Sequence, residues 1–495
     1  MRHLLFIDSY RQLQLFCDGV RTGCDSRRDY FQMAHRVIHY RMRPQLQLQA
    51  WPVHSASTTF VSPSNLSLAT KAPLISQSGH FSHSIPSLKH QRALTIFINC
   101  HFILPFTMSS SDLPDANDPN LGLAHPTAEE LVKIWTRTSS SWKDSLPVHV
   151  FLEESEYLTT VPLAKDGGMT YWILVDKRLS PNERPILCSC ESILKRAITS
   201  DPDGNVEDAI VHGIASVFCF EEHRGRGYAA RHMTEMSKAL RNWKSEQGVI
   251  IGSILYSDIG KKYYSTLGWL PHPNEAQLVF PSVNGAKPTS VQDILEDDIA
   301  SLCERDEAMV RAAMGNPSSE TKRVTVVPNV EHMLFHIRKE DFATKHLFGH
   351  IPKVKGCIAG PPGSQVWAIW YHRYYGHPDP ADASNVLYIM RLVVEGDDTR
   401  SQSTSNSAGR EIAGDQLKAL ESVIRAAQVD AAEWRLQHVK LWDPTPLVRK
   451  AIIQIGLQHE TSERDEHIAS GLWYDADDCV GATPEWIANE YYSFC

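Results

Sequence analysis

One short stretch constrains the fold of this chain more than any other: an apolar strand, a glycine-rich turn and an amphipathic helix follow one another directly. The predicted strand, Val211–Phe220, is almost wholly apolar, as a strand buried on both faces should be. In the helix, five apolar side chains share one helical stripe: Ala229, Met233, Met236, Leu240 and Trp243. The order strand, turn, helix predicts a domain of mixed α and β structure.

The turn between these two elements carries the chemistry. Its sequence, Arg224-Gly225-Arg226-Gly227-Tyr228-Ala229, contains the pattern R-x-x-G-x-A. Glycines let the backbone approach a ligand closely, and the positive end of the following helix suits a pyrophosphate, to which the two arginines add charge. The turn is not a P-loop and lacks the dinucleotide-binding spacing.

This pattern resembles the cofactor motif of the GNAT acetyltransferase superfamily, Arg/Gln-x-x-Gly-x-Gly/Ala. Downstream, a predicted strand at Val249–Leu255 precedes the run Tyr256–Trp269. That run is similar to the second signature of the superfamily, a short helix with aromatic-Tyr-x-x-x-Gly-aromatic. The resemblance implies an α+β fold of GNAT type that uses acetyl-CoA as co-substrate and no metal.

The resemblance also implies where acetyl-CoA would lie. It would occupy a V between the strands Val211–Phe220 and Val249–Leu255, which are expected to splay apart. The backbone of three residues is expected to hold the pantetheine and the acetyl oxygen: Phe218, Cys219 and Phe220. The turn residues expected to hold the pyrophosphate are Arg224, Gly225, Arg226, Gly227, Tyr228 and Ala229.

Catalytic residues follow from the same resemblance. Tyr264 matches the tyrosine that protonates the departing thiolate, and a phenol is a suitable donor for that step. Many relatives carry a carboxylate near the positions of Ala215 and Ser216, but this sequence has none there. Glu191, on the preceding strand, is therefore the first candidate for the base, and His212 is the weaker candidate. A packed strand histidine is the alternative interpretation of His212.

A narrower resemblance concerns the substrate. The segments Val161–Thr170 and Cys190–Arg196 are similar to segments of the fungal lysine N6-acetyltransferase family. This similarity implies transfer of acetyl to the side-chain amine of free L-lysine, the first step of a lysine catabolic route. Alternatives remain an acetyltransferase for polyamines or protein lysines, and a CoA-binding regulatory protein without turnover.

Charge is distributed unevenly along the chain. Residues 1–107 carry eleven Lys and Arg against four Asp and Glu, whereas the whole chain has a formal net charge of −9. The remainder is therefore strongly acidic, which suits a cationic small-molecule amine and not a nucleic acid. Residues 1–107 are expected to be a disordered leader or a mispredicted start. Scattered cysteines and the lack of a bilayer-spanning apolar run favour a cytoplasmic protein, with mitochondria less favoured and no membrane partner.

The domain plan follows from these patterns. The GNAT domain is predicted at 108–285, a connecting segment with a helix at 286–320, and a companion domain at 321–495. The companion repeats the order of strands and helices but lacks the R-x-x-G-x-A turn. We therefore predict a second, degenerate GNAT-like domain without a cofactor. Its aromatic and acidic tail, 485–495, is expected to reach the first domain and line the substrate pocket.

Overall fold

The computed structural model describes residues 113–274, 276–317, 321–379, 382, 384–397, 411–474 and 481–494. The chain divides into two units, residues 1–107 and 108–495. The prediction for residues 1–107 lies outside the described residues. No helix within the described ranges is long and apolar enough to cross a bilayer.

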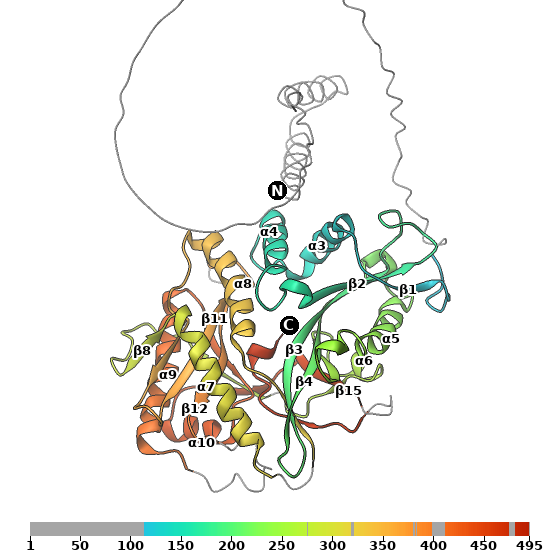
Figure 1. The fold of residues 1–495 in the computed structure, drawn as a ribbon. Helices are drawn as coiled ribbons and strands as arrows, with labels where there is room; N and C mark the ends of the chain where they lie inside the picture. The colour runs from blue at the N-terminus through green and yellow to red at the C-terminus, as the bar shows by residue number, and fades with distance from the viewer. Residues whose placement is uncertain are drawn as a thin grey trace, which may run out of the picture. The chain divides into compact units, whose positions relative to one another are not determined.

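Two mixed β-sheets form the body of the second unit (Figure 1). In the first sheet the strand order is β1 (Leu121–Ala124), β2 (Met169–Asp176), β3 (Cys188–Ser200), β4 (Val206–Phe218), β5 (Ile250–Ser257), β15 (Ile468–Trp473) and β6 (Leu270–Pro271). The C-terminal end of the long strand β3 also pairs with β9 (Arg323–Val326), which pairs with β16 (Glu485–Trp486). Neighbours in this sheet are antiparallel except for β4 with β5 and β9 with β16.

Helices cover both faces of the first sheet. The helices are α3 (Ala128–Trp142), α4 (Val148–Leu158), α5 (Tyr228–Leu240) and the short α6 (Lys262–Ser265). Alternation along β2 decides which face meets which helix: Trp172 joins the cluster of α5, whereas Ile173 joins that of α3. A capping box begins α3: the Thr127 side chain accepts from the Glu130 backbone N–H, and the Glu130 side chain accepts from that of Thr127.

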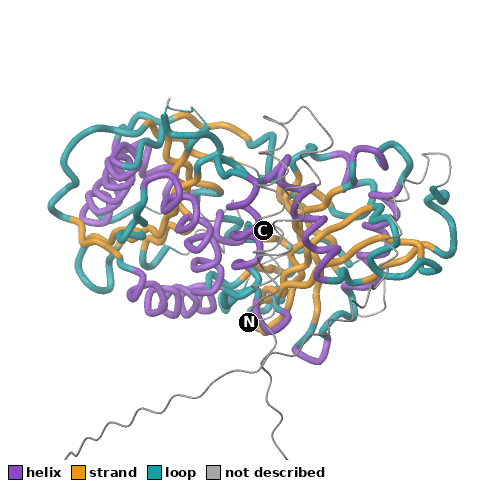
Figure 2. The backbone as a smooth tube through the Cα atoms, turned by 90° about the horizontal axis from the view of Figure 1, so that it is seen from above, coloured by secondary structure: helices purple, strands orange, loops and turns teal. Residues whose placement is uncertain are grey.

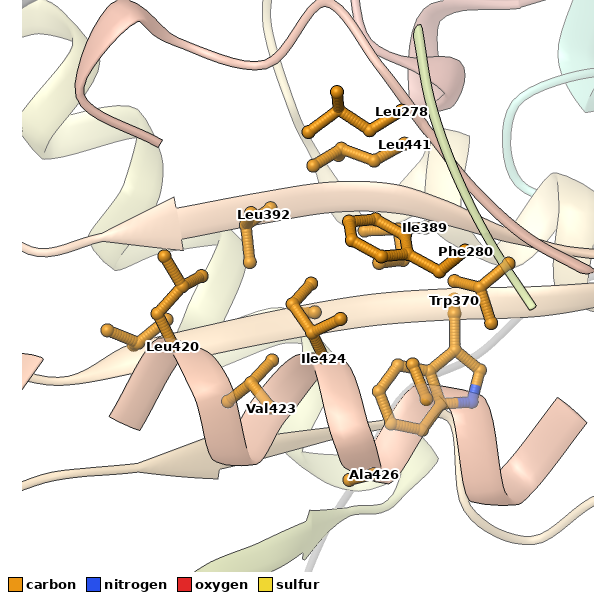
Figure 3. Packing of buried hydrophobic residues seen from close by; sticks show 14 of the residues in the cluster. Leu278, Phe280, Trp370, Ile389, Leu392, Leu420, Val423, Ile424, Ala426 and Leu441 are labelled. Carbon is orange, nitrogen blue, oxygen red and sulfur yellow. The ribbon is translucent and has the colours of Figure 1, made fainter. Parts of the chain in front are cut away.

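The second sheet has the order β14 (Glu460–Glu463), β7 (Ala276–Pro281), β13 (His438–Trp442), β12 (Val386–Val394), β11 (Val366–Arg373), β10 (Gly356–Ala359) and β8 (Val291–Ile294). Its helices are α7 (Glu296–Met314), α8 (Val330–Phe348), α9 (Gly414–Glu433) and α10 (Pro446–Ile455). Trp370 on β11 packs with Ile424 of α9, as Figure 3 shows, whereas Trp367 packs with α7 and α8 on the other face. The fold is thus mixed α and β throughout, as predicted.

Strand membership does not follow the predicted domain boundaries. β7 lies within the predicted first domain, 108–285, yet it belongs to the second sheet. Conversely, β15 and β16 come from the C-terminal region and complete the first sheet. Figure 2 shows the two sheets as separate groups of strands with helices on their flanks. Below, "first lobe" means the first sheet with α3–α6, and "second lobe" means the second sheet with α7–α10.

Candidate active site and cofactor turn

The parallel strands β4 and β5 of the first lobe separate near their C-terminal ends. Pairing between β4 and β5 ends at Ile214 and Leu255, although β4 runs on to Phe218 and β5 to Ser257. Opposite β3, one extra residue is accommodated in β4 between Ala215 and Phe218. Such a bulge bends the strand and disrupts the regular ladder of hydrogen bonds. The predicted V between these strands is therefore present, and it opens at the bulge.

Ser216 is the strained residue of this bulge. Its φ of 53° lies in the left-handed region, which is uncommon for a residue with a Cβ atom. Strain of this kind persists only where the surrounding structure enforces it, and it collects at functional sites. Sequence reasoning placed the acyl-binding backbone at Phe218–Phe220. The strands begin to separate earlier, beside residues 215–217.

The glycine-rich turn has the backbone that a pyrophosphate site needs. Gly225 and Gly227 have φ values of 74° and 84°, and Gly227 directly precedes α5. No side chain caps the N-terminus of α5, so its first N–H groups remain available to a ligand. Arg224 and Arg226 are exposed beside it. The residues present thus fit a diphosphate, and their roles in binding it stay predictions.

Other side chains of this region build the turn itself. Phe218 and Phe220 are buried with Ile134 of α3, and Arg224 Nε donates to the Cys219 carbonyl at 3.0 Å. Tyr228 is buried, and its hydroxyl donates to the Pro114 carbonyl. The side chains of Phe218 and Phe220 thus serve packing, and the role of the backbone at residues 218–220 in binding the cofactor stays a prediction. Ala229, next in the turn, is partly buried and packs against the apolar cluster that contains Tyr228.

A cavity of about 280 Å³ lies where the strands separate. Its lining includes residues 215–217 of β4, Leu255 and Tyr256 of β5, and side chains of α3, α4 and α8. Glu191 and Tyr264 both line it. The structure therefore brings two of the three predicted catalytic residues to one cavity at the mouth of the V.

Glu191 has the properties of a proton acceptor. It lies on β3 directly opposite Ala215 of β4. Burial raises the pKa of the Glu191 carboxyl to about 7, although a hydrogen bond from Ser216 and the charge of Lys339 oppose the shift. A carboxylate with a pKa near the working pH is well matched to general-base catalysis. The sequence has no carboxylate near Ala215 and Ser216 of β4, and Glu191 supplies one from the adjacent strand.

Tyr264 is held as a neutral phenol. It is buried in α6 at 8% exposure and packs with Trp269 and Leu255. Burial raises the pKa of Tyr264 well above its usual value of 10, with smaller contributions from neighbouring Tyr263, cysteines and Asp258. At neutral pH its hydroxyl therefore keeps its proton and can donate it.

The structure contradicts the third assignment, His212. This side chain is buried at 1% exposure on β4 and does not line the cavity. Its Nε2 lies 3.0 Å from the Trp243 carbonyl, and burial lowers its pKa to about 4. A neutral imidazole bonded to a backbone carbonyl on the far side of the strand serves packing, because alternation turns it away from the cavity.

Sequence reasoning missed several charged residues of the cavity. Glu154 comes from α4, Lys339 from α8 and Arg373 from β11, while Asp258 lies 2.6 Å from His467 Nδ1. Lys339 Nζ lies 3.8 Å from a Glu154 carboxylate oxygen. Asp258 could have been found, since it stands in the run that carries the second signature. The residues of α8 and β11 reach the cavity only through packing of the two lobes.

Parallel strands that separate at a bulge, beside a turn shaped for a diphosphate, are the arrangement that the resemblance to the GNAT superfamily predicts. A match to a protein-family model covers the C-terminal part of the chain. Residues 277–495 match the family model described as the LYC1 GNAT-like C-terminal domain. The match begins inside β7 and contains the other strands of the second sheet, together with β9, β15 and β16 of the first sheet.

Individual relatives are distant. An uncharacterized protein of Saccharomyces cerevisiae is 25% identical over 181 residues, which are 31% of this chain and 45% of that protein. A protein of Yarrowia lipolytica named lysine acetyltransferase is 22% identical over 230 residues, 38% of this chain and 57% of that protein. The chain spans about half the length of these curated relatives. A GCN5-related N-acetyltransferase from Kribbella flavida aligns over 71% of this chain and 72% of that chain, with 15% identity and a TM-score of 0.38.

Proposed function

We propose that this protein transfers the acetyl group of acetyl-CoA to an amine, and that its acceptor is the side-chain amine of free L-lysine. One observation carries the proposal: Glu191, whose pKa is about 7, lies in the cavity at which the parallel strands part, together with Tyr264. The resemblance to the GNAT superfamily points to acetyl-CoA as the acetyl donor. In the cavity, Tyr264 would act as the acid and Glu191 as the base.

The residues of the chain would divide the reaction between them. Acetyl-CoA, when bound, supplies the thioester, with its diphosphate at Gly225–Gly227. Glu191 accepts a proton from the acceptor ammonium, whose nitrogen then forms the new bond to the acetyl carbon as the carbon–sulfur bond breaks. Tyr264 gives its proton to the departing thiolate, and the second proton that the nitrogen loses on becoming an amide restores the phenol. Backbone N–H groups at the bulge would stabilise the developing oxyanion.

A base is required because the acceptor is charged. An amine with a pKa near 10.4 has only about one molecule in a thousand unprotonated at neutral pH. The acids Glu154 and Asp258 line the same cavity and favour a cationic acceptor. Lys339 and Arg373 line it as well, and they offer partners for a carboxylate. Cations and acids together suit an amino acid better than a polyamine. The name of the Yarrowia relative points to the same acceptor.

The binding-only alternative rested on the absence of a carboxylate near Ala215 and Ser216 of β4. That support is weakened, because the carboxylate of Glu191 stands beside Ala215 at the same level of the sheet. An acetyltransferase for polyamines or protein lysines remains the second candidate function. The basic residues of the cavity count against polyamines, which carry no negative charge.

The test is transfer of isotope-labelled acetyl to a panel of acceptors: L-lysine, spermidine and a lysine-containing peptide. We expect label on the side-chain nitrogen of lysine, with much lower rates for the other two. Faster transfer to spermidine or peptide would overturn the choice of acceptor. Calorimetry with CoA separates the remaining outcome: binding of CoA with no transfer to any amine would favour the regulatory protein.

A further inference from the structure

The second lobe contains a strand junction of the same kind as the first. β12 and β13 are parallel, and their pairing ends at Ile389 and Leu441, although β12 runs on to Val394. One extra residue, Met390, interrupts the pairing of β12 with β11. Each lobe therefore has a parallel pair that separates next to a bulge. In the first lobe this junction opens into the cavity that holds Glu191 and Tyr264.

In the second lobe the C-terminal tail occupies the junction. The Leu392 N–H, just beyond the bulge, donates to Glu490 Oε2 at 2.9 Å. Arg391 Nη1 donates to Glu490 Oε1 at 2.6 Å, and the other side of the guanidinium bonds both oxygens of Asp306 at 2.7 Å. Glu490 is 0% exposed. A carboxylate of the chain itself thus satisfies backbone and guanidinium donors that a separate ligand would otherwise meet.

From Glu490 the tail crosses to the first lobe. The Tyr492 hydroxyl donates to the Val326 carbonyl of β9 at 2.7 Å. The Ser493 carbonyl accepts from buried Lys195 Nζ of β3 at 3.2 Å. Phe494 then lines the cavity at the mouth of the V. The tail is therefore fixed at one end in the second lobe, and it forms part of the cavity wall at the other.

We propose that Glu490 is a positioning residue for acceptor binding: as an internal ligand of the second junction, it fixes the tail so that Phe494 closes the acceptor cavity. The proposal rests on the proposed function, since it takes this cavity to be the acceptor site. Its physical basis is the arrangement of donors. Hydrogen bonds to a carboxylate are the strong ones, and removal of a buried partner leaves the Leu392 N–H and the Arg391 guanidinium inadequately satisfied.

The kinetic test uses Glu490→Gln, which keeps the size of the side chain and removes its charge. We expect the KM for lysine to rise on the order of 10- to 100-fold, with the KM for acetyl-CoA unchanged. Phe494→Ala should likewise raise the KM for lysine and leave the KM for acetyl-CoA unchanged. The KM for lysine of the double variant should not exceed that of the more impaired single variant. The control is Glu485→Gln, an exposed acid at the start of the same tail. A fall in kcat with unchanged lysine KM in folded Glu490→Gln would overturn the proposal.

A second measurement needs no activity. Native carboxypeptidase digestion followed by mass spectrometry reports whether the tail is held. In the wild type, Tyr491 and Tyr492 are fully buried, so digestion should stop at the last residues. Glu490→Gln should allow digestion to proceed through Tyr491 at temperatures well below the melting temperature of the variant. Equal protection of both proteins would refute anchoring by Glu490, even if the wild type transferred acetyl to no amine. The proposed function, by contrast, would be refuted if the wild type transferred acetyl to no amine.

Discussion

Glu191 on β3 lies directly opposite Ala215 on β4, at the point where β4 leaves its parallel neighbour β5. The carboxylate therefore reaches the mouth of the V from the adjacent strand. It therefore offers a base for the proposed transfer, although β4 itself has no acid near Ala215 and Ser216. It also makes the assignment testable, because removal of the charge leaves the strand pairing intact.

Replacement of that carboxylate should abolish most of the activity. We expect Glu191→Gln to lower kcat on the order of 10²- to 10⁴-fold, the range typical of a general base. Affinity for CoA, measured by calorimetry, should stay unchanged. Glu207→Gln, an exposed acid near the start of β4, is the matched control. Near-normal turnover by Glu191→Gln would remove Glu191 from the mechanism.

The same carboxyl should make activity and stability depend on pH in opposite directions. Its folded pKa of about 7 lies above the unfolded value, so folding favours the protonated form. Stability from this group is present below the unfolded pKa and is lost as pH rises through 7. Denaturant unfolding at pH 5 and pH 8 should therefore show wild type losing on the order of 1–3 kcal/mol relative to Glu191→Gln. The specificity constant kcat/KM of the wild type should rise between pH 5 and pH 8, as Glu191 loses its proton.

Loss of the phenolic proton donor should slow the transfer step. Tyr264→Phe keeps the ring that packs with Trp269, so the fold should survive. We expect kcat to fall on the order of 10- to 100-fold with little change in either KM. Tyr263→Phe, the neighbouring tyrosine of α6, is the control. If both variants turn over equally fast, Tyr264 is not the acid.

The turn can be tested through backbone conformation alone. An added Cβ at Gly225 would meet nothing within 4 Å, so Gly225→Ala changes only the preference for φ, which is 74° here. The left-handed conformation disfavours alanine by about 1–2 kcal/mol. We expect a raised KM for acetyl-CoA with an unchanged KM for lysine. Gly285→Ala, also unobstructed but without a left-handed φ, should leave both constants unaltered.

Recognition of a carboxylate predicts a difference between two acceptors. Lys339→Ala should raise the KM for lysine by about tenfold, yet leave the KM for the diamine cadaverine unchanged, since that amine has no carboxylate to bind. Steady-state kinetics with both amines provide the measurement. Lys345→Ala, an exposed lysine further along α8, is the control. An equal rise in KM for both acceptors would show that Lys339 does not bind the carboxylate of lysine.

The sequence alone determined the local parts of the site. The apolar strand, the glycine turn and the helix stripe predicted β4, the turn and α5, because periodicity and left-handed backbone preferences act over a few residues. The run Tyr256–Trp269 likewise placed Tyr264 on a short helix next to β5. Glu191 could be proposed because two consecutive strands are commonly neighbours in a sheet.

Only the tertiary structure decided which distant segments meet. His212 was a reasonable candidate from its type, but strand alternation and the Trp243 carbonyl turn it away from the cavity. The entry of β15 beside β5 and of Glu490 into the second junction depends on contacts between segments more than 90 residues apart. Such contacts leave no local period in the sequence. They arise because buried donors and apolar faces must find partners wherever the folded chain brings them.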